Sequence, residues 1–410
     1  MRGLPGLNFS RRVFANALLA AVSLAAAVAT AEAGLRAFFP QPLREAYRAV
    51  DAGGPITRRD PEIGWTLKPD LAWTTGSAPW ENGLTTNAAG FRDGPHAAAK
   101  APGAYRVVVL GDSFVFGSGV PQEGTLTRRL AAHLGPGFEI VNLGVPGYGT
   151  DQELLPLRRW DRALSPDLVL LGFFWNDVLE NASDFIYGLP KPTFTLEGGT
   201  LVLHPPAGFS APSTFARIDA SLASKSHLWS LLENGLFTAG RAAGGPAEER
   251  PVSVDLSLKV PPSSRAGEFA LTFALLGAVR DEAASLGVPF AVFSVPPRFL
   301  AEPRVGARLL RVYGLPEDAF DEDGFRLVRE ASKARGIPFV DLLPGFRNEA
   351  ASGARLFEST GIRWTEAGQD LAARLLAPAV RGGLPPITSR SRAPAAPPGP
   401  PAPGSSGSAR

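Results

Sequence analysis

The sequence predicts an α/β fold in which helices cover both faces of a parallel β-sheet. Apolar runs such as 107–110 and 167–173 stop abruptly at polar or glycine-rich turns, as strands buried on both faces do. In the last third of the chain, helical patterns end at a glycine and lead into another apolar run. Because helices that alternate with apolar strands act as crossovers, the strands are expected to run parallel.

Composition narrows the possible functions. The chain has 410 residues, 45% of them hydrophobic, which is enough for a large core in one or two domains. Its net charge is +2 with scattered arginines, so nucleic-acid binding is not expected. The absence of cysteine excludes disulfides and thiolate metal sites. Carboxylates and histidines do not cluster at ligand spacing, so the sequence predicts no metal and no organic cofactor.

Residues 1–40 have the features of an export segment. Arg2, Arg11 and Arg12 precede the apolar run 17–29, and small residues follow at positions 29, 31 and 33. The stretch 10–14, Ser-Arg-Arg-Val-Phe, also resembles the twin-arginine export motif. An uninterrupted apolar run this short suits a cleaved signal peptide.

A second interpretation treats the same segment as a single-pass anchor. Counting 13–39 as one helix places Glu32 near its outer end and leaves the arginine-rich side inside the cell. Both interpretations predict an exported protein of the cell envelope or periplasm. A buried helix of a soluble protein is the remaining alternative.

Residues 41–103 read as an irregular extension rich in short turns and poor in strands. The segment 87–92, Asn-Ala-Ala-Gly-Phe-Arg, precedes the first strong strand, so we attach the extension to the main domain. We expect it to be a loop that packs Trp65 and Phe91 onto the core, and not a direct substrate contact.

The chain is organised around residues 106–119, where a buried strand leads into Gly111, Asp112 and Ser113. Ser113 then lies at the carboxyl end of the strand, the edge at which open α/β sheets bind ligands. A helix that starts there would direct unpaired amide groups at a bound anion. The simpler alternative is that Ser113 only caps that helix.

Two later strand ends are expected at the same edge of the sheet. The run 138–143 leads into the glycine-rich turn 144–149, and the run 167–173 leads into Trp-Asn-Asp at 175–177. The order and spacing of these three blocks resemble the SGNH or GDSL superfamily of ester hydrolases. The resemblance implies a flavodoxin-like three-layer α/β/α sandwich over residues 104–382.

The same resemblance assigns roles to individual residues. It implies that Ser113 is the nucleophile, and that the Gly144 amide, the Asn176 side chain and the Ser113 amide form an oxyanion hole. Asp112 and Asp177 are the supporting residues beside them. One departure is Phe174, which stands where the family has a glycine.

The fourth block of the family is degenerate. Arg363 stands where the catalytic histidine is expected, and neither Thr360 nor Gly361 can replace the aspartate. A guanidinium has no acceptor, so it cannot take the proton of Ser113. The four histidines all lie outside the last third of the chain, at positions 96, 133, 204 and 227.

Two hypotheses from different classes follow. The first is an ester hydrolase or O-acyl transferase acting on an acylated substrate of the cell envelope, such as a carbohydrate. In it, Glu358, Glu366 or Asp177 substitutes as base. The second is a catalytically inactive module that binds an acylated or anionic glycan in the same cleft, with Arg363 supplying charge.

The remaining segments complete the predicted organisation. Residues of about 180–265 form an aromatic-rich insertion that either roofs the cleft or makes a small satellite core. The α/β pattern resumes with helices at 268–286 and 325–334 and strands at 289–295 and 337–342. The Pro-, Ala-, Gly- and Ser-rich tail, 383–410, lacks the apolar content to fold and is taken as disordered.

Overall fold

We analysed a computed structural model of the 410-residue chain. It describes residues 6–39, 56–73, 84–94, 100–186, 189–207, 222, 226–229, 231–232, 252–260, 263–358 and 362–382. The tail, much of the insertion, and Thr360 and Gly361 lie outside these residues.

A five-stranded parallel sheet forms the centre of the molecule, with the order β13-β12-β7-β5-β6. All four neighbouring pairs are parallel. In chain order this is the 2-1-3-4-5 arrangement of doubly wound, flavodoxin-like folds, so the predicted fold class is confirmed. The strands are β5 (Tyr105–Leu110), β6 (Phe138–Asn142), β7 (Leu168–Phe173), β12 (Phe290–Ser294) and β13 (Phe339–Val340).

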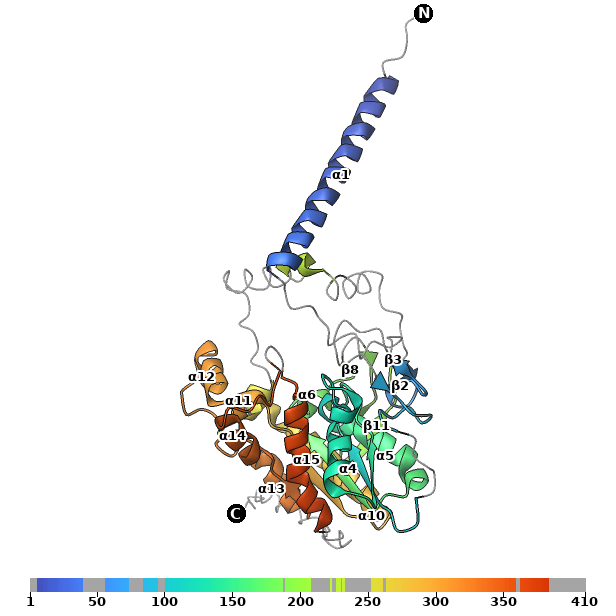
Figure 1. The fold of residues 1–410 in the computed structure, drawn as a ribbon, viewed down its shortest axis with the longest axis vertical. Helices are drawn as coiled ribbons and strands as arrows, with labels where there is room; N and C mark the ends of the chain where they lie inside the picture. The colour runs from blue at the N-terminus through green and yellow to red at the C-terminus, as the bar shows by residue number, and fades with distance from the viewer. Residues whose placement is uncertain are drawn as a thin grey trace, which may run out of the picture.

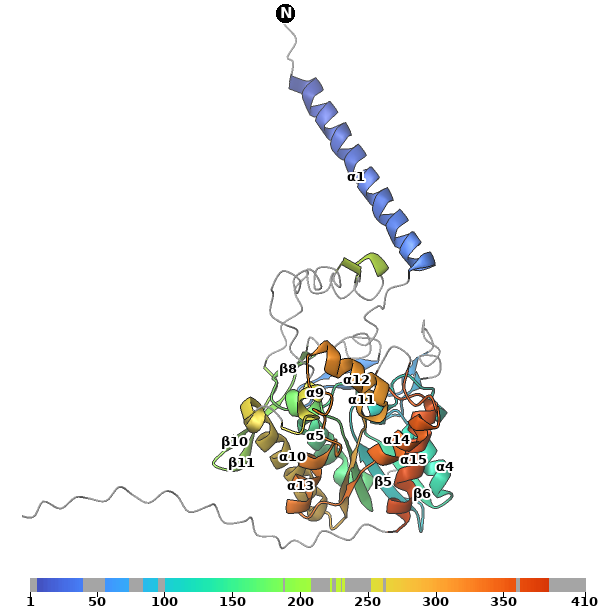
Figure 2. The ribbon, with the colours of Figure 1, turned by 90° about the vertical axis from the view of Figure 1, so that its left-hand side faces the viewer.

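Helices cover both faces of the sheet (Figure 2). On one face α4 packs against α15 and α15 against α14, and on the other α10 packs against α5 and α13. The helices of the domain are α3 (Ser113–Phe116), α4 (Leu126–Leu134), α5 (Thr150–Leu164), α6 (Asp177–Glu180), α9 (Val252–Leu256), α10 (Ala266–Ser285), α11 (Arg298–Ala301), α12 (Pro303–Val312), α13 (Arg326–Ala334), α14 (Leu343–Ala351) and α15 (Glu366–Arg381), with short 3₁₀ turns at Gln122–Gly124 and Ser263–Arg265.

The elements expected from the sequence lie close to the observed ones. In β5 and β7 the apolar residues are almost completely buried, because helices cover both faces of these strands. The last strand is shorter than expected: β13 spans two residues of the predicted 337–342. Glycines with positive φ follow two helices as expected, at Gly287 and Gly336.

The N-terminal extension carries more regular structure than its turn-rich sequence indicates. Two antiparallel pairs form, β1 (Thr57–Asp60) with β2 (Gly64–Leu67) and β3 (Ala72–Trp73) with β4 (Leu84–Thr85). Trp65 is fully buried against Tyr148, and Phe91 lies edge-on to Trp160. The extension is thereby packed onto the α/β domain.

The described part of the insertion begins with two hairpins. They pair β8 (Phe185–Ile186) with β9 (Leu189–Pro190), and β10 (Thr193–Glu197) with β11 (Thr200–His204). Between them, Lys191 is buried and donates to Asp151 Oδ2 at 2.5 Å and to the Glu180 carbonyl at 2.6 Å. This buried ion pair joins the insertion to the start of α5.

Helix α1 (Gly6–Phe38) projects away from the α/β domain (Figure 1). Its residues Val13–Phe38 are long and apolar enough to cross a membrane, with a mean hydropathy of 2.0. By length and composition this helix is compatible with both a signal peptide and an anchor.

Candidate active site

Ser113 is the first residue of α3, directly beyond the carboxyl end of β5. Asp112 caps the helix, its carboxyl accepting a hydrogen bond from the Phe114 amide at 2.8 Å. The Ser113 side chain is half-buried. The alternative in which Ser113 only caps the helix is wrong, because Asp112 is the capping residue and Ser113 is the first helical residue.

A buried arginine from the N-terminal extension holds the other end of α3. Arg92 is fully buried, and its guanidinium donates to the carbonyls of Phe116, Gly117 and Val120 at 3.0, 2.6 and 2.7 Å. It also lies over the Phe116 ring, 4.7 Å from the ring centroid. The Gly117 carbonyl also accepts from the Val120 amide at 3.3 Å, so Arg92 ties the end of α3 to the turn that follows it and fixes the backbone that carries the serine.

The glycine-rich turn after β6 lies beside the serine loop. A side chain on Gly144 would meet the backbone of α3, with the Phe116 nitrogen only 2.3 Å from an added Cβ. Asn142 connects the two segments, donating to the Val115 carbonyl at 3.0 Å and accepting from the Gly144 amide at 2.9 Å. The Gly144 amide, the predicted oxyanion donor, therefore already has an acceptor inside the chain.

Gly147 supplies a second candidate oxyanion donor in the same turn. Within the described residues, the Gly147 amide donates to no acceptor, whereas the Val145 and Tyr148 amides donate to backbone carbonyls. Gly147 has φ +79°, a conformation that favours glycine. The sequence pattern offered this glycine alongside Gly144, but only the hydrogen-bond geometry separates the two.

Asn176 follows β7 and immediately precedes α6. Its Nδ2 donates to Glu180 Oε1 at 2.8 Å, which uses one of the two N–H bonds of the amide and leaves the other for a ligand. Ser113, Gly144 and Asn176 thus follow three adjacent parallel strands, at one edge of the sheet. This edge lies at the point where the strand order reverses, the usual ligand position in such folds.

Five carboxyl groups are buried together behind this edge. They belong to Asp112, Asp151, Glu153, Asp177 and Glu180, each at most 3% exposed. Burial, and then the nearby charges of the other carboxylates, raise the pKa of Glu153 and Asp177 well above their ordinary values. Glu153 and Asp177 therefore hold their protons more tightly than free carboxyl groups do.

Asp112 belongs to this cluster and also interacts with the serine. Burial raises its pKa from 3.8 to about 6, although hydrogen bonding from Phe114 and from Ser113 opposes the shift. In the same cluster Thr150 donates to Asp177 Oδ2 at 3.1 Å. Nothing in the sequence alone indicated that these acids would be buried side by side.

Aromatic contacts bring the fourth block to the serine loop. The Phe114 ring lies between Phe174 and Trp364, with centroid separations of 4.9 and 5.0 Å. Phe174, which departs from the family pattern, therefore fills part of the core under the site. Because Trp364 packs on the residue after Ser113, Arg363 is held close to the serine loop.

Arg363 and Glu358 both approach the turn that follows α3. A Cβ on Gly119, which has φ +93°, would lie 2.4 Å from Glu358 Oε1 and 3.7 Å from Arg363 Cδ. The Glu358 amide also donates to the Arg363 carbonyl at 3.0 Å. Because Gly119 has no side chain, it leaves space for one acidic and one basic side chain, Glu358 and Arg363, at the rim of the serine loop.

The other two candidate bases have different surroundings. Glu366 is exposed and pairs with Arg129 at 3.1 Å, and Asp177 is buried in the carboxyl cluster. Among the three acids considered from the sequence, Glu358 is the one found beside both Arg363 and the serine loop.

The described histidines make hydrogen bonds with groups other than Ser113. His133 Nε2 lies 3.0 Å from Asp370 Oδ1, His204 Nε2 lies 2.8 Å from the Thr195 hydroxyl, and the His227 backbone amide donates to Glu32. Among the described residues, none of them hydrogen-bonds to Ser113. His96 lies outside the described residues.

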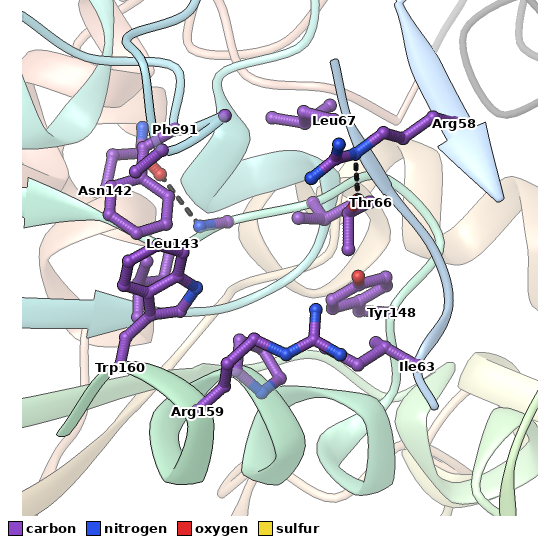
Figure 3. A pocket seen from close by; sticks show the side chains of 15 residues that line it. Arg58, Ile63, Thr66, Leu67, Phe91, Asn142, Leu143, Tyr148, Arg159 and Trp160 are labelled. Atoms are coloured by element: carbon purple, nitrogen blue, oxygen red, sulfur yellow. Dashed lines mark hydrogen bonds between the residues drawn. The ribbon is translucent and has the colours of Figure 1, made fainter. Parts of the chain in front are cut away.

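A small pocket lies on the far side of the glycine-rich turn (Figure 3). Leu67, Asn142, Tyr148, Arg159 and Trp160 are among its lining residues, and its volume is about 40 Å³. This holds a water molecule but not a sugar ring. The pocket belongs to the packing of the extension and does not include Ser113.

A larger groove of about 690 Å³ lies between α11, α12 and the end of α14. Arg298, Arg304 and Arg355 line it together with Glu302 and Phe357. Arg298 also donates to the Glu358 carbonyl at 2.9 Å, which connects the groove to the fourth block. The described residues contain no group of three or more His, Cys, Asp or Glu that could hold a metal.

Comparison with known proteins gives a family match for part of the chain. Residues 257–397 match the family described as SGNH hydrolase-like domain, acetyltransferase AlgX. No curated protein sequence matches the chain.

Solved structures to which the chain is similar include TesA and two proteins described as esterases. TesA is 13% identical, with 68% of this chain and 98% of TesA covered and a TM-score of 0.36. The acetyl xylan esterase AlAXEase is 12% identical, with 67% and 99% covered and a TM-score of 0.37. The psychrotrophic esterase EstA from Pseudoalteromonas sp. is 11% identical, with 68% and 97% covered and a TM-score of 0.34. Such low TM-scores define no shared activity or substrate.

The doubly wound sheet, the serine at its switch point and the family match define an SGNH hydrolase-like domain. The family match itself is limited to residues 257–397, about a third of the chain. The C-terminal third of the chain is of the AlgX type, which is acetyltransferase-related.

Proposed function

We propose that the protein carries the acyl-transfer site of an SGNH-type ester hydrolase or O-acyl transferase of the cell envelope, centred on Ser113 and directed at an acylated carbohydrate, but with a degenerate catalytic base. The observation that carries the proposal is the position of Ser113 at the start of α3, at the switch point of the sheet. Asp112 and Arg92 fix this helix from both ends.

In the proposed reaction, Ser113 Oγ attacks the acyl carbon and the ester C–O bond breaks, so that the acyl group moves to the serine and the alcohol leaves. Water or a sugar hydroxyl then takes the acyl group from Ser113. Asn176 and an amide of the glycine-rich turn donate to the oxyanion. Since the Gly144 amide already bonds to Asn142, Gly147 is the better candidate for that amide.

The step that this chemistry leaves unsupported is the removal of the proton from Ser113. Arg363 occupies the base position and cannot accept it. In well-studied triads, loss of the base alone lowers turnover by roughly a million-fold. We therefore expect the native protein to hydrolyse simple activated esters barely above background.

An assay with p-nitrophenyl acetate tests the role of the serine. We expect the native protein and Ser113→Ala to give nearly equal, low rates. Serine-dependent turnover would show instead that another group accepts the proton. Glu358, beside the serine loop, and Asp112, whose carboxyl interacts with the serine, would then be the residues to replace.

The arginine-lined groove favours a second candidate function, an inactive module that binds an anionic glycan. Arg304 and Arg355 are exposed at this groove, beside the block that carries Arg363. Binding of polygalacturonate, with dextran as the neutral comparison, tests this candidate by calorimetry. Arg304→Ala with Arg355→Ala should weaken binding, whereas Arg311→Ala on α12, outside the groove lining, should not. Equal affinity for dextran would exclude charge recognition.

A further inference from the structure

Helix α1 contacts a described segment of the insertion at its outer end. Glu32 Oε2 accepts from the Ser226 hydroxyl and from the Leu228 amide, both at 2.8 Å, and Glu32 Oε1 accepts from the His227 amide at 3.0 Å. Residues 226–229 and 231–232 are named the capping segment below. Figure 1 shows this short segment beside the end of α1 nearer the α/β domain.

The contact has the form of a helix cap made between distant parts of the chain. The free amides at the start of a helical turn need acceptors, and a carboxylate is a strong one. Ser226 adds to it by accepting from the Trp229 amide at 3.1 Å. Arg36 donates to Glu32 at 2.7 Å and completes the surroundings of the carboxylate.

The partly buried residues of α1 are those close to this contact. Between Val13 and Phe38, Glu32, Gly34 and Leu35 are partly buried and the other described side chains are exposed. About 20 apolar residues cross a bilayer, so a span that begins at Val13 ends close to Glu32. The capping segment then lies at the level of the outer lipid headgroups.

The residues of the capping segment are of the kinds found at the level of the lipid headgroups. Leu231 and Leu232 are 39% and 50% exposed, and Leu222, just before the segment, is 36% exposed. Trp229 is half-buried beside them. Tryptophan and exposed leucines next to a membrane span are typical of segments that lie in the membrane interface.

We propose that α1 is retained as an anchor and that the capping segment, docked on it through Glu32, lies in the outer interface of the bilayer. Cleavage near the small residues 29–33 would remove or separate Glu32 and leave the capping segment without its cap. The partner of the exposed leucines is therefore the lipid surface itself. The inference does not depend on the chemistry proposed for Ser113.

The absence of cysteine makes a clean labelling experiment possible. Leu232→Cys carries a fluorophore in the full-length protein, reconstituted in vesicles of phosphatidylethanolamine and phosphatidylglycerol that contain doxyl-labelled lipids. Lys333→Cys, exposed on α13 far from the anchor, is the matched control. We expect several-fold stronger quenching at position 232 than at position 333, and an intact mass that includes α1 for protein purified from membranes.

The Glu32→Ala variant tests the dock itself, with Glu197→Ala in the exposed β10–β11 hairpin as its control. We expect Glu32→Ala to reduce quenching of the label at position 232, and Glu197→Ala to leave it unchanged. A mature protein that begins after residue 31 or 33 would overturn the retained anchor. Equal quenching at both label positions in anchored protein would overturn the lipid contact and indicate water or a protein partner there.

Discussion

The guanidinium of Arg92 donates to the Gly117 carbonyl at 2.6 Å, and so connects the N-terminal extension to the helix that carries Ser113. The extension and the serine loop are more than twenty residues apart in the chain. Arg92 is fully buried, and its guanidinium also donates to the carbonyls of Phe116 and Val120. The extension is therefore part of the scaffold of the candidate site.

Arg92→Met should destabilise the fold by on the order of 3 kcal/mol, because three buried carbonyls each lose a hydrogen bond from the guanidinium. Arg92→Lys should cost a similar amount, since an ammonium cannot reproduce the planar fork. Urea unfolding measures the effect. Arg58→Met, at an exposed arginine of β1, should change stability by less than about 0.5 kcal/mol. Equal effects at the two positions would contradict the role of Arg92.

The buried pair of Lys191 and Asp151 should be costly to break from one side. Lys191→Met leaves a buried carboxylate without its cation, and we expect a loss of about 3–5 kcal/mol in unfolding free energy. Lys191→Met with Asp151→Asn should recover part of that loss. Lys259→Met removes one partner of an exposed pair with Asp318 and should leave the unfolding free energy almost unchanged. A loss at Lys191 no larger than at Lys259 would contradict burial of the pair.

The buried carboxyl group of Asp112 should make the free energy of unfolding fall as pH rises. Its pKa is about 6 in the folded protein against an ordinary 3.8, so the folded state binds the proton more tightly. This contribution is fully present below about pH 4 and is lost as pH rises through about 6. Asp112→Asn keeps an acceptor for the Phe114 amide and should stabilise the protein at pH 8 by on the order of 3 kcal/mol, with little effect at pH 4.

Thermal unfolding across this pH range measures the difference. Asp281→Asn, on the exposed face of α10, controls for the change in net charge. A gain from Asp112→Asn that is equally large at pH 4 would mean that burial of the charge is not its cause.

Export can be measured separately from anchoring. A fusion of residues 1–40 to alkaline phosphatase, which is active only outside the cytoplasm, should give activity. If the twin-arginine route is used, replacing Arg11 and Arg12 by lysine should abolish export of a folded reporter. Retention of the unaltered fusion in the cytoplasm would contradict the assignment of residues 1–40.

Much of the fold was predictable because each strand of the sheet is a continuous apolar run that ends at a polar turn. The same pattern places Ser113, Gly144 and Asn176 at strand ends, and neighbouring parallel strands necessarily end at one edge. The roles of Arg92 and Lys191 were not predictable, since their partners lie in distant segments. The choice between Gly144 and Gly147 depends on where a single amide points, which no residue pattern records.

The central claim is that the acyl site retains its serine and donors but lacks a base. The direct test installs histidine at Arg363 and aspartate at Gly361, two residues before it in the sequence, and measures hydrolysis of p-nitrophenyl acetate. We expect the double variant to be measurably faster than the native protein, and Ser113→Ala in that background to abolish the gain. Robust native hydrolysis that Ser113→Ala abolishes would contradict the claim, because another residue would then be serving as the base.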